Sequence, residues 1–138
     1  MLGHLYDKQD CSAARALELV GERWSLLILR DAMFRGHTRY SDFMKTLEIA
    51  PNILSKRLSG FVAAGLMVQG DDAAYRLTDK GLAFKPVIMA LTAWGDRWVG
   101  PGPVEFIAKD TRAPVRVELR DDAGAVTDLT RVGVKPRT

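Results

Sequence analysis

The chain has 138 residues, of which 47% are hydrophobic and 27% are charged, and its formal net charge is +3 at pH 7. This length fits one globular domain with a small appendage, and the apolar content is sufficient for a buried core. No apolar run approaches the roughly 18 residues of a membrane span, and the first residues, MLGHLYDKQDCSAAR, lack the basic and apolar segments of a secretion signal. We therefore expect a cytoplasmic protein that does not contact a membrane.

Metal binding and catalysis find no support in the sequence. Cys11 is the single cysteine, which excludes an internal disulfide, and with only His4 and His37 beside it no zinc site can be assembled. The chain has no phosphate-cradling glycine loop, no histidine and carboxylate paired at a useful spacing, and no nucleophile elbow. We predict no metal, no cofactor and no catalytic residues, so the protein is not expected to be an enzyme.

Two helices are predicted at the start of the chain. Residues 11–20, CSAARALELV, are rich in Ala and Leu and form a helix that ends at Gly21. The next helix begins near Glu22 and ends at Gly36. Its residues expected to face a core are Trp24, Leu27, Ile28 and Met33.

A pair of short helices about four residues apart comes next. The first covers residues 38–47, with Thr38 as a possible cap, and the second begins at Pro51, which suits a first helical turn, and ends at Gly65. The apolar stripes of the two helices are Tyr40, Phe43, Met44 and Leu47, and Leu54, Leu58, Phe61 and Val62. This arrangement is typical of a helix-turn-helix.

A β-hairpin is predicted after Gly65. Two β-type runs flank the turn Gly70-Asp71-Asp72, and the second run passes through Tyr75 and Leu77. A helix-turn-helix followed by a hairpin indicates a winged helix, so the predicted fold class is mainly α with a small β component.

The helical segment after the hairpin carries a wide apolar stripe. Thr78 can cap it, and because Pro86 has no N–H we expect a short helix to residue 84 or 85 and a longer helix restarting there, or a kink. The stripe consists of Phe84, Val87, Ile88, Leu91, Trp94 and Trp98. It is wider than a small core needs, and apolar patches of this size usually mark interfaces. We predict a homodimer in which the 11–20 helix packs with the 86–98 helix across a two-fold axis.

The last part of the chain has a different character. A Pro/Gly link at residues 100–103 is followed by alternating runs at 104–110, 114–121 and 126–134, with the turn DDAGA between the last two. We therefore divide the chain into a winged helix DNA-binding and dimerisation domain, residues 1–99, and a small β appendage of two or three strands, residues 104–138.

Ordered motifs from residue 11 to about residue 95 carry a family resemblance. They are a Cys before a helix with the pattern L-x-L-V-G-x-x-W, an aromatic near the start of the third helix, the run I-L-S-K-R-L-x-x-F-x-x-x-G-L, and a closing Y-x-L-T-x-x-G with a Pro and a Trp downstream. The matching residues are Cys11, Gly21, Trp24, Leu29, Tyr40, Leu54, Arg57, Leu58, Gly65, Leu66, Tyr75, Leu77, Thr78, Gly81, Pro86, Leu91 and Trp94. The sequence resembles the HxlR family of bacterial winged helix-turn-helix transcriptional regulators. The resemblance implies a homodimer that binds a palindromic operator in double-stranded DNA, and we expect it to act as a repressor.

The charge pattern agrees with a DNA partner. A recognition helix must offer hydrogen-bond donors and short side chains to base edges, while nearby cations neutralise phosphates. The 51–64 helix presents a donor-rich face without a carboxylate, and the window 35–57 has five basic and two acidic residues, enough to account for the whole net charge. The candidate base or backbone readers are Asn52, Ser55 and Lys56, and the candidate phosphate contacts are Arg35, Arg39, Lys45 and Arg57. Two alternatives stay open: the face can be an ordinary solvated surface, and Arg57 can pack or pair within the fold.

Two departures from the family pattern matter. The wing tip is short and acidic, GDDAA, so we expect DNA binding to rest on the recognition helix rather than on the wing. The tail lacks the cysteine pairs found in some relatives and is expected to be metal-free.

The sequence offers two candidate sites for sensing a signal. Cys11 at a helix start is a candidate redox or electrophile sensor, because a helix N-terminus favours a thiolate, and its alternative is a small buried hydrophobe in the dimer interface. Trp24, Leu91, Trp94 and Trp98 form either the dimer interface or a pocket for a small-molecule effector. The alternative function is a winged helix that binds a small molecule or a protein and has no DNA-binding role.

Overall fold

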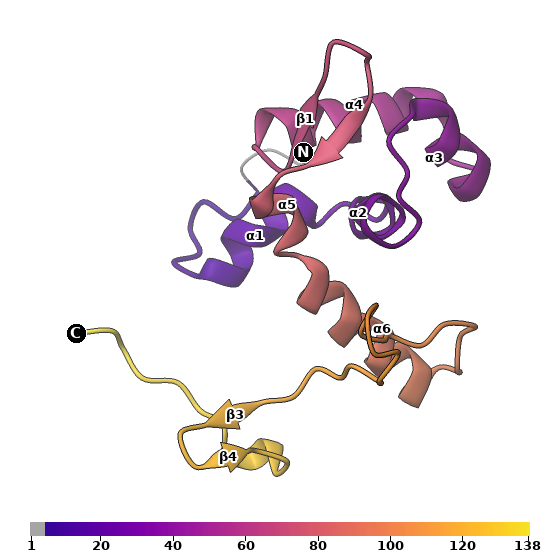
Figure 1. The fold of residues 1–138 in the computed structure, drawn as a ribbon. Coiled ribbons are helices and arrows are strands. Elements are labelled where there is room, and N and C mark those ends of the chain that lie inside the picture. The colour runs from indigo at the N-terminus through magenta and orange to yellow at the C-terminus, as the bar shows by residue number, and fades with distance from the viewer. Residues whose placement is uncertain (1–4) are drawn as a thin grey trace. The chain divides into compact units, whose positions relative to one another are not determined.

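A computed structural model describes residues 5–138, so His4 lies outside the described residues. The chain divides after Ile88 into two compact units, which are described separately. The elements of the chain (Figure 1) are, in order, α1 (Ser12–Val20), α2 (Ser25–Phe34), α3 (Tyr40–Leu47), α4 (Pro51–Ala63), β1 (Met67–Gln69), β2 (Tyr75–Leu77), α5 (Asp79–Leu82), α6 (Lys85–Trp98), β3 (Arg120–Asp121), β4 (Gly124–Ala125) and the 3-10 helix η1 (Leu129–Arg131). None of these helices is long and apolar enough to cross a membrane.

The first two helices follow the sequence pattern with one shift. α1 begins after Cys11 and ends at Gly21, as predicted. α2 begins at Ser25 rather than near Glu22, because a turn closed by the Ser25 N–H on the Glu22 carbonyl, at 3.0 Å, comes first. After α2, Gly36 takes a left-handed φ of 71°, which residues with a side chain adopt only rarely.

The helix-turn-helix consists of α3 and α4, with residues 48–50 between them. The prediction that Thr38 caps the first of these helices was wrong. The helix begins at Tyr40 with Arg39 as its N-cap, and the Arg39 N–H donates to the Asp42 carboxylate at 3.3 Å. The Thr38 carbonyl instead accepts the Tyr75 N–H at 2.7 Å, so this residue is bound to the hairpin.

The core of the first unit lies between α2, α3, α4 and β1. Its most deeply buried apolar residues are Ile28, Leu29, Phe43, Leu54, Leu58, Phe61, Leu66 and Met67. Val62 was predicted to join this core but is 37% exposed. At 3.6 residues per turn it lies about 80° around the helix from Leu54, at the edge of the stripe.

The predicted hairpin is present and is tied to the end of α4. β1 and β2 pair antiparallel, with Met67 opposite Leu77. α4 is terminated by Gly65 with a φ of 78°, and the Thr78 hydroxyl both donates to the Gly65 carbonyl at 2.5 Å and accepts the Gly81 N–H at 3.2 Å. Thr78 therefore caps α5 as predicted. A Cβ at Gly81 would meet the Leu66 carbonyl oxygen at 2.1 Å, so only glycine allows this close packing.

Two helices occupy the segment in which Pro86 predicted an interruption. α5 ends at Leu82, two residues before the expected end, and α6 begins at Lys85. Pro86 is the second residue of α6, where its missing N–H costs no helical hydrogen bond. Ile88 is the buried residue of α6, whereas Trp94 is 59% exposed.

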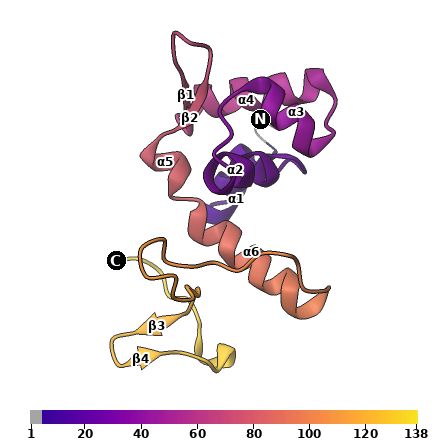
Figure 2. The same cartoon turned by 45° about the vertical axis from the view of Figure 1, so that its right-hand side comes forward.

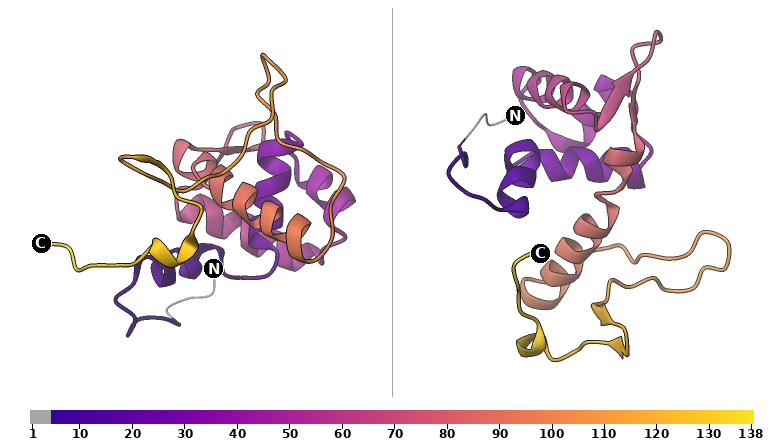
Figure 3. Two further views of the ribbon diagram at one scale, coloured as in Figure 1. Left: turned by 90° about the horizontal axis from the view of Figure 1, so that it is seen from below. Right: turned by 90° about the vertical axis from the view of Figure 1, so that its left-hand side faces the viewer.

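The predicted β appendage has shorter strands than its alternating pattern indicated. β3 and β4 pair antiparallel over two residues each, and Ile107 and Pro114 form an isolated bridge. Where the third run was expected, η1 begins after Asp128, whose carboxylate accepts the Thr130 N–H at 3.1 Å and hydroxyl at 2.7 Å. These hydrogen bonds lower the pKa of the Asp128 carboxyl. The segment is mostly irregular chain (Figure 3), and its apolar side chains are exposed or half-buried.

Candidate nucleic-acid interface

The outward face of α4 carries the three residues predicted to read DNA. Asn52, Ser55 and Lys56 are all exposed, and no acidic residue occurs in this helix. α3 and α4 lie together beside the hairpin in the upper part of the first unit (Figure 2), as a helix-turn-helix requires. The donor-rich surface that was expected from the sequence is therefore available in the folded unit.

Tyr40 fixes the start of this helix. Its hydroxyl donates to the Pro51 carbonyl at 2.8 Å, which joins the first residue of α3 to the first residue of α4. Pro51 occupies the first turn of α4, where its fixed φ favours the helix. The contact restrains the angle between the two helices, because it connects their N-terminal ends directly.

A buried carboxylate connects α2 to α3, and sequence analysis missed it. Asp31 is fully buried, and its carboxylate accepts hydrogen bonds from Arg30 Nε at 2.8 Å and from Thr46 Oγ1 at 2.7 Å. Arg35 Nε lies 3.3 Å from the same carboxylate. A buried charge is tolerated only when it is paired and hydrogen-bonded. The available sequence signal was an acidic residue inside an apolar helix with arginines one residue before it and four residues after it.

This pairing changes the interpretation of Arg35. It was predicted as a phosphate contact, and its side chain is 54% exposed. Because its Nε faces Asp31, part of its donor capacity is used within the fold. Lys45, predicted for the same role, is exposed on α3.

Arg57 takes the alternative that the sequence left open. Its Nε lies 3.4 Å from Glu22 Oε2, and its side chain is only 13% exposed. Glu22 also accepts the Trp24 N–H at 3.0 Å, so the pair joins the turn before α2 to the middle of α4. The Arg57 Nε and Nη1 atoms are buried without a hydrogen-bond partner among residues 5–138. In this structure Arg57 connects α4 to the turn before α2 from inside the fold.

One of the two carboxylates at the wing tip, Asp72, is paired with arginines. Asp72 forms an ion pair of 2.8 Å with Arg76 and lies 3.8 Å from Arg39 Nη2, and Arg39 Nη1 also donates to the Asp72 carbonyl. The hydrogen bonds from Arg76, and then from the Ala74 N–H, hold the pKa of the Asp72 carboxyl well below its usual range. The same carboxylate raises the pKa of Arg76. The acidic wing tip described from the sequence therefore contains one carboxylate, Asp72, that is paired with arginines within the fold.

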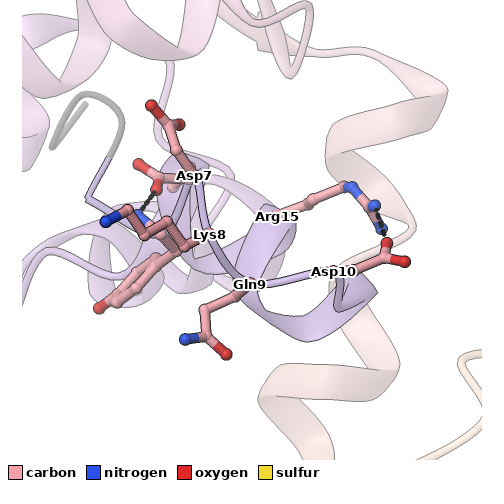
Figure 4. Close-up of a pocket in the computed structure, with 7 residues that line it drawn as sticks. Asp7, Lys8, Gln9, Asp10 and Arg15 are labelled. Carbon is pink, nitrogen blue, oxygen red and sulfur yellow. Dashed lines mark hydrogen bonds and ion pairs between the residues drawn. The ribbon is translucent and has the colours of Figure 1, made fainter.

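Cys11 is exposed at the N-cap of α1, and its side chain makes no capping hydrogen bond. A surface pocket of about 450 Å³ lies immediately before and along this helix (Figure 4). Its lining residues are Tyr6, Asp7, Lys8, Gln9, Asp10, Arg15 and Glu18. Arg15 forms an ion pair of 2.6 Å with Asp10 in this lining, so this is a charged pocket unlike the aromatic pocket considered from the sequence.

The aromatic and aliphatic residues considered for a pocket or an interface have different environments. Trp24 is half-buried and packs against the core of the first unit. Leu91, Trp94 and Trp98 are 54%, 59% and 67% exposed on α6. Trp24 therefore contributes to the core, and the other three residues remain available for an interface.

Known proteins are similar to this chain in sequence and in fold. The chain is 39% identical over 104 residues to Mb3122, an uncharacterised HTH-type transcriptional regulator of Mycobacterium bovis, and the alignment covers 71% of this chain. The same alignment covers 64% of the length of that relative. The crystal structure of PA1607, a candidate transcription factor, matches with a TM-score of 0.84 and 36% identity over 95% of this chain and 98% of that chain.

A second similar structure is quinone-bound YodB from B. subtilis. It has a TM-score of 0.56 and 28% identity, and the match covers 64% of this chain and 99% of that chain. The family model described as HxlR-like helix-turn-helix matches residues 19–103, which is more than half of the chain and includes α2, the helix-turn-helix, the wing and α6. The chain therefore belongs to the HxlR-like helix-turn-helix family, and its fold is the winged helix of that family.

Proposed function

We propose that this protein is a dimeric, sequence-specific DNA-binding transcriptional regulator that represses genes by occupying a palindromic operator. The observation that carries the proposal is the outward face of α4, which exposes Asn52, Ser55 and Lys56 without an acidic neighbour in the helix. Tyr40 and Arg57 hold the same helix from behind through Pro51 and Glu22. A rigid, donor-rich helix is the element that a winged helix inserts into the major groove.

The roles of the site residues follow from their exposure. Asn52 and Ser55 read base edges from the first turns of α4, and Lys56 contacts a base or the backbone. Lys45 and the exposed parts of Arg35 and Arg39 neutralise phosphates beside the groove. Arg57 acts indirectly, because its guanidinium is directed into the fold rather than toward solvent.

Dimerisation uses the apolar face of α6. Val87, Leu91, Trp94 and Trp98 recur on one side of the helix and are 48% to 67% exposed. An uncovered stripe of two tryptophans and two aliphatic residues is a typical protein interface. We propose that it packs with α1 of a second subunit, within a DNA-binding and dimerisation domain of residues 1–99 that carries residues 104–138 as an appendage.

The regulatory signal is proposed to be an oxidant or an electrophile that reacts with Cys11. The thiol is exposed at the start of α1, the helix assigned to the dimer interface. A similar structure, YodB, is described in its quinone-bound form. A small-molecule effector that binds without covalent chemistry is the alternative signal.

Selection of bound fragments from genomic DNA tests this function directly. The purified protein is incubated with random genomic fragments, retained fragments are sequenced, and the enriched sites are confirmed by electrophoretic mobility shift. We expect enrichment of inverted repeats whose half-sites lie roughly 34 Å apart, one helical turn, or a multiple of that distance. Retention without sequence enrichment, or no retention at all, would contradict the proposal.

A further inference from the structure

One carboxylate in the wing joins two arginines that come from different elements. Asp72 Oδ2 accepts a hydrogen bond from Arg76 Nη2 on β2 at 2.8 Å, and Arg76 Nη1 reaches Oδ1 at 3.2 Å. Arg39, the N-cap of α3, donates through Nη1 to the Asp72 carbonyl and has Nη2 3.8 Å from Oδ2. The wing tip is thereby attached to the beginning of the helix-turn-helix.

The same carboxylate also organises the turn of the wing. Asp72 Oδ1 accepts the Ala74 N–H at 3.1 Å, and the turn is closed by hydrogen bonds between Gly70 and Ala74 at 3.0 Å and between Ala73 and Gly70 at 2.9 Å. Ala73 takes a left-handed φ of 64° at this point. Asp72 therefore has a defined position, and the two guanidinium groups bound to it are fixed with it.

Both arginines keep donors for an external anion. Their side chains are 51% exposed for Arg39 and 53% exposed for Arg76. A guanidinium has five N–H donors, and Asp72 uses only the Nη groups of Arg76 and of Arg39. With two positive charges and one negative charge the cluster keeps a net charge of +1, next to α3 and on the same unit as the exposed face of α4.

We infer that Asp72 is a positioning residue that holds Arg39 and Arg76 as a preassembled contact for a DNA backbone phosphate beside the recognition helix. The inference rests on the proposed DNA-binding function and adds the wing to the interface. Without Asp72 each long side chain would have to be ordered when DNA binds, and immobilising such a side chain carries an entropic cost.

If Asp72 has this role, removing its charge changes the DNA affinity in the direction opposite to the one that charge alone predicts. Neutralising an acidic residue near DNA normally strengthens binding, because it removes repulsion from the phosphates. If Asp72 positions the arginines, its neutralisation weakens binding. Asp71 provides a matched control, since it is the adjacent exposed carboxylate in the same turn and makes none of these contacts.

The experiment compares Asp72→Asn with Asp71→Asn for affinity to the selected operator over a series of salt concentrations. Asn keeps a side-chain oxygen for the Ala74 N–H, so the turn is retained while the charge is lost. We expect Asp72→Asn to bind about threefold to tenfold more weakly, the cost of ordering one or two side chains. We expect its salt slope not to decrease, because both arginines still neutralise the phosphate once they are ordered. Asp71→Asn should bind as tightly as the wild type or more tightly.

A second set of variants separates positioning from a purely structural role. In an Arg39→Ala, Arg76→Ala background, Asp72→Asn should no longer weaken binding, because the groups through which Asp72 acts are absent. Arg76→Lys keeps the charge but cannot make the paired contact, and it should weaken binding with an unchanged thermal midpoint. Arg76→Lys decides the question if Asp72→Asn proves to be unfolded, because it leaves Asp72 in place; unchanged operator affinity in Arg76→Lys would then overturn the positioning role.

The outcomes distinguish this inference from the proposed function. If the wild type binds its operator but Asp72→Asn binds equally well or more tightly, as Asp71→Asn does, the positioning role is overturned and the function stands. The positioning role is also overturned if Asp72→Asn weakens binding by the same factor with and without the arginines. If the wild type binds no DNA, the proposed function itself fails, and this inference fails with it.

Discussion

The Thr46 hydroxyl donates a hydrogen bond of 2.7 Å to the fully buried carboxylate of Asp31, and this contact joins α3 to α2 behind the helix-turn-helix. Arg30 in α2 and Arg35, the C-cap residue of that helix, balance the charge of Asp31. The hydroxyl is therefore the link between the two helices at this point. Its removal leaves a buried carboxylate with one hydrogen bond fewer.

Thr46→Val is expected to lower the free energy of unfolding by about 1 to 3 kcal/mol, the usual value of a hydrogen bond to a charged group. The substitution keeps the shape of the side chain and removes only its hydrogen-bonding capacity. Urea denaturation measures the change, and Thr46→Ser, which keeps the hydroxyl, is the control. A Thr46→Val protein as stable as the wild type would show that the contact contributes nothing to stability.

Lys56→Ala is expected to weaken operator binding and to decrease the salt slope by about 0.9, because one phosphate neutralisation is lost. Lys56 is exposed on α4, so the stability of the unit should not change. Fluorescence anisotropy with labelled operator at several salt concentrations measures both quantities. Lys109→Ala, an equivalent change at an exposed position of the tail, is the control. Unchanged binding in Lys56→Ala would count against the proposal that α4 enters the major groove.

Arg57→Ala is expected to act through stability instead. Its side chain is 13% exposed and pairs with Glu22, so truncation leaves the Glu22 carboxylate without its counter-charge and should cost about 3 kcal/mol of unfolding free energy. The operator affinity should fall without a change in the salt slope, because no phosphate contact is lost. Arg137→Ala, at an exposed position near the C-terminus, should change neither quantity. A reduced salt slope in Arg57→Ala with unchanged stability would instead identify Arg57 as a phosphate contact.

Trp94→Glu is expected to convert a dimer into a monomer and to abolish tight operator binding. Trp94 is 59% exposed in the centre of the α6 stripe, where a charge would be buried against a second subunit. Light scattering at micromolar concentration gives the molecular mass. Val134→Glu introduces the same charge at a fully exposed position of the tail and should leave the dimer intact. A wild-type monomer under these conditions would contradict the proposed interface.

Treatment with diamide or a quinone is expected to change the operator affinity of the wild type and to leave Cys11→Ser unaffected. With diamide, two Cys11 thiols, one from each subunit, form a disulfide while the reagent takes up two electrons and two protons; with a quinone, the thiolate adds to the ring. Either product lies at the start of α1 and can shift the spacing of the recognition helices. If the wild type keeps its affinity, or if Cys11→Ser loses it equally, Cys11 is a packing residue and not the sensor.

Local sequence signals determined most of the first unit. Pro51 and Gly65 bound α4, because the fixed φ of proline suits a first helical turn and glycine readily adopts the left-handed φ of 78° that ends the helix. Gly70-Asp71-Asp72 marked the turn between β1 and β2. Thr78 capped α5 because its hydroxyl accepts the Gly81 N–H in the first turn of the helix. Signals of this kind act over a few residues, so the sequence alone is sufficient to read them.

Local signals predicted the structure of the tail, residues 104–138, less accurately. Its runs alternate between apolar and polar residues, and alternation indicates which side chains share one face of an extended segment. A strand forms only when a second segment pairs with it, and only β3 and β4 and the bridge from Ile107 to Pro114 find partners in the described part of the chain. The periodicity therefore predicted extended chain correctly in places and overestimated the length of its strands.

The sequence by itself determined the order of the helices, the position of the wing and the donor-rich composition of α4. Only the tertiary structure decided which charged side chains are paired within the fold. Asp72 contacts Arg39 across 33 residues, Thr46 contacts Asp31 across 15, and Arg57 faces Glu22 rather than solvent. No local pattern specifies these pairs, because an ion pair depends on where the packed core places two side chains and not on their separation along the chain.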